Sequence, residues 1–484
     1  MKKKLLSLIL ILFLSVSVFL TGCKEVVLED NPATGANVIS NGGMSVVKGD
    51  YLYFVNGYVD ETSLSDKDNK MGEVEKSAIY RTKLVNGEIV KDKDGFVEKT
   101  ERVVSKVVGF SNGGFYIIDD YIYYATPYMN YNQSGVLQTS RVEFHRININ
   151  GSEKSDTKLY TTSVSEQNLD WTMYKVNGTV YLLTYCDGKI ISVNASNGNV
   201  VAEIANSSSY AFAYETNYST SKSRDSELAK YVYFTRAVEP ADNAGVNVKG
   251  NVICKFDVTN GEVKPLNVID DYTYTITGTL GDSLYYTKAN SKYNGEAILY
   301  RKPVSDSWSK VSEIEMSAGA AYTNYYLCPF GDNMVIATDD NGTYVIEAGI
   351  RTVLSSTKYN ILGIYGSYVY YTSGEENTTL ARFNLNDRNS LSGGQITTEN
   401  ASTSDKSQKL DNKNFIDFDN QRVYVFAEYT AENSDKNYYL NYINETTRDE
   451  RFVGKFESND IPSKPEQNEG YGEDEEVKYI PHID

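Results

Sequence analysis

Residues 119–124 read DDYIYY, a turn pair followed by a run of aromatic and β-branched residues, and this pattern recurs along the chain. The eight copies of the run begin at Tyr51, Tyr121, Thr179, Tyr231, Ser283, Asn333, Tyr368 and Arg422. Pairs such as Gly49-Asp50 and Asn177-Gly178 precede most copies, and these residue types favour tight turns. A turn followed by a β-rich run predicts a β-hairpin at each copy.

A second strand pattern follows each run after a polar segment of variable length. In several copies it ends in a basic residue and leads to a turn pair, as in Ile79-Tyr80-Arg81 before Asn86-Gly87 and Phe144-His145-Arg146 before Asn150-Gly151. Asn-Gly pairs supply the positive φ angles of tight hairpin turns, so strands are expected on both sides of each pair. The repeating unit is therefore several antiparallel strands.

The eight copies begin 35 to 70 residues apart, with a mean spacing of about 53. A propeller blade of four strands with a loop has about this length, whereas the coils of a β-helix are shorter. Helix-period patterns are almost absent, and β-branched and aromatic residues dominate the apolar positions. The sequence predicts an all-β chain whose residues 43–456 form a single β-propeller of seven or eight four-stranded blades. The 35-residue interval before Tyr368 leaves the count open.

This unit of turn, aromatic strand and Leu/Ile-Tyr-Arg strand resembles the bacterial β-propeller lipoproteins of the YWTD/TolB-like kind. The resemblance covers about residues 43 to 456. It implies a propeller fold and a location outside the cytoplasm, and it transfers no reaction and no functional residue.

The first residues are typical of a secretory signal peptide. Lys2, Lys3 and Lys4 precede an apolar run from Leu5 to Leu20. At about 16 residues this run is shorter than the roughly 20 that a membrane-spanning helix needs.

The tetrapeptide Leu20-Thr21-Gly22-Cys23 resembles the lipobox of bacterial lipoproteins. The resemblance implies cleavage before Cys23 and attachment of lipid to its thiol, and two or three acyl chains anchor a protein durably. We therefore expect residues 1–22 to be a signal peptide and residues 23–42 to be the lipidated Cys23 and a tether. We expect the protein to lie on the extracytoplasmic face of the cell membrane.

The formal net charge of −18 becomes −21 when the three lysines of the signal peptide are removed. Such a surface is a poor partner for nucleic acid. Residues 457–484 form a polar, acidic tail that we expect to be disordered. Cys186, Cys254 and Cys328 remain besides Cys23, and we favour three buried free thiols over one disulfide.

The sequence contains few residues or motifs that are typical of a catalytic site. His145 and His482 are the only histidines, and His145 occupies a slot that Tyr80, Cys254 and Tyr300 hold in other copies, so we expect a packed strand residue. Residues 281–284 spell the GDSL motif of an esterase family, but here they are one more copy of the repeat turn. We expect no catalytic residue, no metal site and no cofactor apart from the lipid on Cys23.

Tyrosines outside the strand runs offer planar faces and hydroxyl groups for a ligand. The tyrosines that we place in inter-strand segments are Tyr128, Tyr131, Tyr210, Tyr214, Tyr218 and Tyr293, and we expect ligand contacts from them. The functional hypothesis is a lipid-anchored propeller that binds an envelope protein or a glycan without catalysis. The alternatives are a carboxylate-dependent polysaccharide hydrolase or lyase and a structural scaffold of a membrane-associated assembly.

Overall fold

The computed structural model describes the chain in segments separated by short gaps. These are residues 28, 45–55, 70–71, 74–75, 79–90, 100–104, 106, 108, 115–131, 137–162, 169–186, 188–212, 230–239, 250–266, 270–290, 295–304, 308–328, 333–365, 367–373, 379–386, 407–410, 416–419, 422–430, 436–444, 450–454 and 477–478. Cys23, residues 1–22, which we expect to be a signal peptide, and most of residues 457–484 lie outside them.

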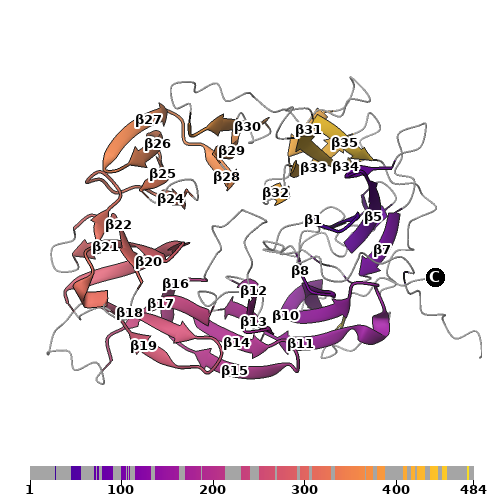
Figure 1. The fold of residues 1–484 in the computed structure, drawn as a ribbon, viewed down its shortest axis with the longest axis horizontal. Helices are drawn as coiled ribbons and strands as arrows, with labels where there is room; N and C mark the ends of the chain where they lie inside the picture. The colour runs from indigo at the N-terminus through magenta and orange to yellow at the C-terminus, as the bar shows by residue number, and fades with distance from the viewer. Residues whose placement is uncertain are drawn as a thin grey trace, which may run out of the picture.

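The described strands form antiparallel sheets that succeed one another around a ring (Figure 1). Blade 1 contains β1 (Ser45–Lys48), β2 (Tyr51–Val55), β5 (Ile79–Val85), β6 (Glu88–Ile89) and β7 (Thr100–Val104); blade 2 contains β8 (Phe115–Ile118), β9 (Tyr121–Tyr131), β10 (Leu137–Asn148) and β11 (Thr157–Thr161). Blade 3 contains β12 (Asp170–Val176), β13 (Thr179–Cys186), β14 (Lys189–Asn194) and β15 (Asn199–Ile204); blade 4 contains β16 (Ser207–Ala211), β17 (Tyr231–Ala237), β18 (Asn251–Asp257) and β19 (Val263–Pro265).

The second half of the ring repeats this order. Blade 5 contains β20 (Tyr272–Leu280), β21 (Ser283–Asn290), β22 (Ile298–Pro303) and β23 (Ile314–Glu315); blade 6 contains β24 (Asn324–Leu327), β25 (Met334–Asp339), β26 (Gly342–Glu347) and β27 (Ile350–Ser355). The sheet after it contains β28 (Asn360–Tyr365), β29 (Tyr368–Ser373) and β30 (Thr379–Asn384), and the last contains β31 (Ser407–Leu410), β32 (Ile416–Asp419), β33 (Arg422–Thr430), β34 (Lys436–Asn444) and β35 (Glu450–Gly454). Small elements outside the blades are the hairpin β3 (Lys70–Met71) and β4 (Val74–Glu75), and the 3₁₀ turns η2 (Glu153–Ser155) and η5 (Trp308–Lys310).

The predicted all-β propeller of seven or eight blades is confirmed. Seven sheets are four-stranded blades once the interrupted edge strands β6 with β7 and β31 with β32 are each counted as one. The sheet β28–β30 has three strands among the described residues. Each of the eight predicted runs forms the second strand of its sheet, from β2 through β33.

Blades 2 to 6 each bury both faces of their sheet against the neighbouring blades. In β8, Phe115 and Ile117 pack in a hydrophobic cluster with blade 1, while Tyr116 and Ile118 pack in a second cluster with blade 3. Successive strand residues point to opposite faces of a sheet, so a run without polar alternation is what a blade between two others requires. The tyrosine-rich runs therefore supply the contacts that hold the ring together.

A basic side chain of the third strand covers a tyrosine of the second strand in four sheets. The guanidinium carbon of Arg81 lies 4.4 Å from the centre of the Tyr51 ring, and the corresponding pairs are Arg146–Tyr121, Lys255–Tyr231 and Arg382–Tyr368. In each case the basic residue is directly opposite the tyrosine two positions further along, as Arg81 is opposite Tyr53. This diagonal cation–π contact explains the basic residue at the end of the repeat.

The two faces of the ring differ in their connections. Pairs such as Gly49-Asp50 and Asn177-Gly178 link first to second strands, and several of these turn residues have positive φ angles, as predicted. Turns such as Asn86-Gly87, also at positive φ, link third to fourth strands on the same side. We call this the short-turn face. Second-to-third connections and connections between blades lie on the opposite side, which we call the long-connection face.

Gly250 lies where the start of blade 4's third strand meets the segment entering blade 5. A Cβ atom on Gly250 would lie 2.2 Å from the carbonyl oxygen of Asp270 and 2.4 Å from that of Tyr272. Because both neighbours are backbone atoms, Gly250→Ala should lower the free energy of unfolding by about 1–3 kcal/mol. A Cβ atom on Gly295 would meet Asn290 at an ordinary 3.5 Å, so Gly295→Ala serves as the control in urea denaturation. Equal urea midpoints for Gly250→Ala and Gly295→Ala would contradict the close backbone packing at Gly250.

Candidate functional site

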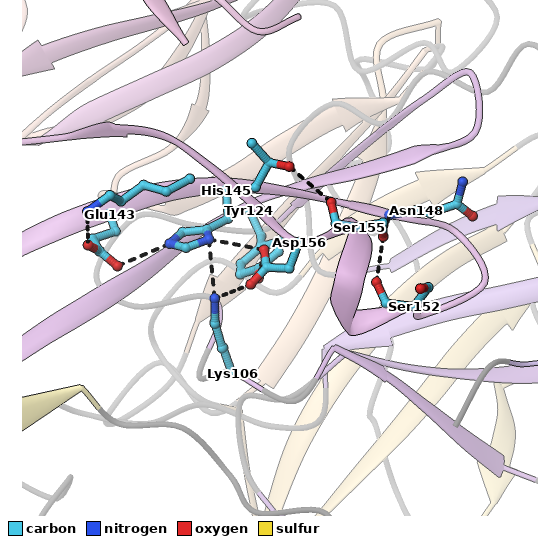
Figure 2. A network of polar contacts seen from close by, with 10 residues as sticks. Lys106, Tyr124, Glu143, His145, Asn148, Ser152, Ser155 and Asp156 are labelled. Atoms are coloured by element: carbon cyan, nitrogen blue, oxygen red, sulfur yellow. Dashed lines mark hydrogen bonds and ion pairs between the residues drawn. The ribbon is translucent and has the colours of Figure 1, made fainter. Parts of the chain in front are cut away.

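A buried polar cluster lies in blade 2, where it meets the segment that leaves blade 1. Figure 2 shows His145 of β10 between the carboxylates of Glu143 and Asp156, with Lys106 approaching from the segment after β7. The imidazole Nε2 lies 3.1 Å from Glu143 Oε2, and Nδ1 lies 3.0 Å from Asp156 Oδ1 and 3.2 Å from Lys106 Nζ. His145, Glu143 and Lys106 are all buried.

Local sequence explains half of this cluster. Glu143 and His145 are two residues apart on a strand and so share one face of the sheet. The ring of Tyr124, opposite His145 on β9, stacks on the imidazole at 5.5 Å, and its hydroxyl donates to Asp156 Oδ1 at 2.9 Å. The other half comes from far along the chain, because Lys106 forms an ion pair with Asp156 across the boundary between the blades.

The charges of this cluster compensate one another. Burial alone would raise the pKa of Asp156, but hydrogen bonding and charge from His145 and Lys106 outweigh it, so the pKa lies well below its usual range. Glu143 accepts from His145 and from Lys158, whose Nζ lies 2.9 Å from Oε1. Both ring nitrogens of His145 thus contact charged groups of the cluster itself.

The neighbouring serine is a turn residue rather than a nucleophile. Ser155 Oγ accepts from the Asn148 N–H at 2.8 Å and donates to the Ser152 carbonyl at 2.5 Å (Figure 2). A nucleophilic serine needs a base within hydrogen-bond reach, and Ser155 bonds to backbone groups instead. The cluster is suited to fastening the segment after blade 1 to blade 2.

A second cluster lies on the long-connection face, at the start of β12. Tyr210 of β16 donates from its hydroxyl to Asp170 Oδ2 at 2.8 Å, and the backbone N–H of Trp171 donates to Oδ1 at 2.8 Å. Tyr185 is directly opposite Asp170 on β13, and its ring stacks on that of Tyr210 with centroids 4.0 Å apart. Burial raises the pKa of Asp170, and the two hydrogen bonds offset this only in part.

A third feature of this face is a strand added from far along the chain. β9 and β10 form a long hairpin that extends past β8, which pairs only with Tyr121–Tyr124. On the same edge, β36 (Val477–Lys478) pairs antiparallel with β9 at Met129 and Tyr128. A segment of the C-terminal tail thus extends blade 2.

The six predicted ligand-contact tyrosines are not brought together among the described residues. Tyr128 and Tyr131 belong to β9, and Tyr210 to β16, so our placement of these three in inter-strand segments was wrong. β9 is longer, and β16 starts earlier, than the apolar pattern indicates, because pairing with the neighbouring strand extends each of them. Tyr214, Tyr218 and Tyr293 lie outside the described residues, and ligand contact by any of the six stays a prediction.

The structure also describes the histidine, the cysteines and the repeat-turn serine that the sequence analysis singled out. His145 is a buried strand residue, as predicted, although its charged partners were missed; the Glu143-x-His145 spacing was the available signal. Cys186, Cys254 and Cys328 are buried free cysteines, as favoured. Ser283 starts β21, and its hydroxyl contacts Asp282 of the adjoining turn at 3.2 Å.

Two features, a membrane-spanning helix and a metal site, are absent from the described part of the chain. None of its helices is long and apolar enough to cross a membrane. None of its clusters combines three or more His, Cys, Asp or Glu side chains in a way that could hold a metal ion.

No family model and no curated protein matches the sequence. Solved structures with a similar fold include oligopeptidase B from Trypanosoma brucei at 12% identity and prolyl oligopeptidase B from Galerina marginata at 10%, each with a TM-score of 0.40. The matches cover 71% and 70% of this chain, which spans about half the length of these solved chains. A putative TolB from Agrobacterium tumefaciens matches at 10% identity and a TM-score of 0.28, over 65% of this chain and 88% of its own.

These comparisons correct the functional hypothesis. We predicted a propeller that binds an envelope protein or a glycan without catalysis, whereas the similar solved chains include prolyl oligopeptidases, oligopeptidase B and an acylaminoacyl peptidase. The hypothesis is contradicted, and neither the polysaccharide enzyme nor the scaffold replaces it. Composition and charge do not distinguish among roles, because the propeller repeat is shared by proteins with different roles.

Asp156→Asn should destabilise the chain at neutral pH by about 3 kcal/mol, because Lys106 loses its buried ionic partner. A carboxyl group whose folded pKa is lowered stabilises the fold above its unfolded pKa of about 3.9, and this contribution is lost as pH falls through the folded value. The gap in unfolding free energy between wild type and variant should therefore narrow from pH 7 to pH 2. Asp340→Asn, which removes an exposed pair with Lys358, should change stability by less than about 1 kcal/mol at either pH. If the difference in unfolding free energy between wild type and Asp156→Asn stays constant from pH 7 to pH 2, the stabilisation by the ionised Asp156 carboxylate is refuted.

Proposed function

We propose that this chain binds polypeptide segments in an extended conformation, the class of molecule on which peptidases act, by adding them as a strand to β9. The site is the edge of β9 between Ala125 and Tyr131, beyond the end of β8.

One observation carries this function: the edge of β9 already accepts a strand. β10 pairs with β9 along its whole length, so β36 necessarily lies on the opposite edge. An exposed strand edge offers backbone N–H and C=O groups that pair with any extended peptide, and alternate side chains then provide specificity. Pro127, which has no N–H, is a residue typical of such an edge.

The strand already present is short enough to be exchanged. β36 pairs through two residues, and each backbone hydrogen bond contributes only about 0.5–1.5 kcal/mol net. Residues 455–476 connect β36 to the last sheet, and such a tether holds the segment at an effective concentration in roughly the millimolar range. The tail therefore occupies the edge in the absence of a stronger ligand and competes with added peptide.

Replacing both Val477 and Lys478 with proline should open the edge. N–H groups of adjacent strand residues point to opposite sides, so the double replacement removes the one that faces β9. A fluorescein-labelled peptide with the sequence of residues 473–484 should bind this full-length variant at least about tenfold more tightly than wild type in fluorescence anisotropy.

The control variant carries Val477→Thr with Lys478→Arg, which keeps both N–H groups and should bind like wild type. A labelled peptide with proline at the same two positions should bind neither chain. If no chain shows saturable binding of the unmodified peptide, strand addition at β9 is refuted.

We also propose that lipid on Cys23 holds the propeller at the extracytoplasmic face of the membrane. The lipobox-like residues Leu20 to Cys23 support this location. Metabolic labelling with an alkyne analogue of palmitate should mark the wild-type chain and a Cys186→Ala variant, whose replaced thiol is buried. Cys23→Ala should lose the label and leave the membrane fraction, and a label retained by Cys23→Ala would exclude this anchor.

A further inference from the structure

We propose that Asp170, with the stacked rings of Tyr185 and Tyr210, binds a cationic group of a polypeptide, an ammonium or a guanidinium. This inference rests on the proposed binding of polypeptide and names the chemistry that a bound segment must carry. The three residues come from blades 3 and 4 and meet on the long-connection face, the face on which β36 joins blade 2.

The carboxylate of Asp170 has capacity left for another donor. A carboxylate accepts about four hydrogen bonds, and this one receives two, from the Tyr210 hydroxyl and the Trp171 N–H. Both donors are neutral, so the negative charge is not compensated. Among the residues that the structure describes, no ion pair involves Asp170.

Several partly or fully buried acids of the chain have cationic partners. Asp156 pairs with Lys106, Asp257 lies 3.1 Å from Lys230, and Glu313 pairs with Lys288. A buried carboxylate without a partner is costly, because burial removes the water that would otherwise solvate it. A cation from outside the chain would therefore stabilise the carboxylate of Asp170, whose two donors are neutral.

The aromatic pair beside Asp170 favours a cation over a neutral donor. Tyr185 and Tyr210 stack with an interplanar angle of 23°, and both side chains remain partly exposed, as does Asp170. Cations are attracted to the faces of such rings, and this chain uses the same interaction internally where Lys255 lies 4.2 Å from the centre of the Tyr231 ring. The formal charge of −18 adds attraction for any cationic ligand.

Small probes test this site independently of strand addition. Nα-acetyl-lysine methylamide presents a side-chain ammonium, glycine amide presents an amino terminus, and Nα-acetyl-norleucine methylamide is the neutral control. In calorimetric titration of the full chain, at least one cationic probe should bind about tenfold or more tightly than the neutral probe. The preferred probe identifies whether a basic side chain or an amino terminus is recognised.

Asp170→Asn should weaken binding of that probe at least tenfold, whereas Asp282→Asn on the short-turn face should leave it unchanged. Tyr185→Leu keeps the carboxylate and removes one ring, so it should give a smaller loss and reports on the site even if Asp170→Asn does not fold. Equal binding of neutral and cationic probes, or unchanged binding in folded Asp170→Asn, overturns the cation site. Probe binding without peptide binding at β9 would instead refute the proposed strand addition alone.

Discussion

The structure depends on one packing constraint: each blade has to bury both faces of its sheet against its neighbours. Phe115 and Ile117 face blade 1 while Tyr116 and Ile118 face blade 3, so one four-residue strand contributes to two hydrophobic clusters. A single blade cannot satisfy this requirement, because its second face would remain exposed. Closure of the ring solves the problem for all blades at once, and this is why the aromatic runs recur through the chain.

Burying so many tyrosines brings polar groups into the interior, and the repeat supplies partners for them. Arg81 is fully buried, yet it lies over the Tyr51 ring and contacts the Tyr53 hydroxyl and Glu101. The His145 cluster follows the same rule with two carboxylates opposed to two lysines. Asp170 departs from the rule, since its two donors are neutral. A partly buried carboxylate that has only neutral donors and lies beside a stacked aromatic pair is a reason to look for a ligand.

The two faces of the ring carry different structural features. Tight turns, several of them with positive φ angles, connect the strands on the short-turn face. The long-connection face carries the extended β9–β10 hairpin, the added strand β36 and the Asp170 cluster. Loops placed on a rigid scaffold commonly carry function, and here the blades supply the scaffold.

By itself, the sequence determined the strands and their repetition, because turn chemistry and aromatic runs act within a few residues of one another. It also determined that His145 would be buried in a strand and that three thiols would stay free. Only the tertiary structure decided that Lys106 would reach Asp156, that Tyr210 would close on Asp170 and that Val477 would pair with β9. These contacts join residues that are 40 to several hundred positions apart, and the packing of whole sheets decides which of them meet. No local pattern encodes that packing, since it depends on residues distant along the chain.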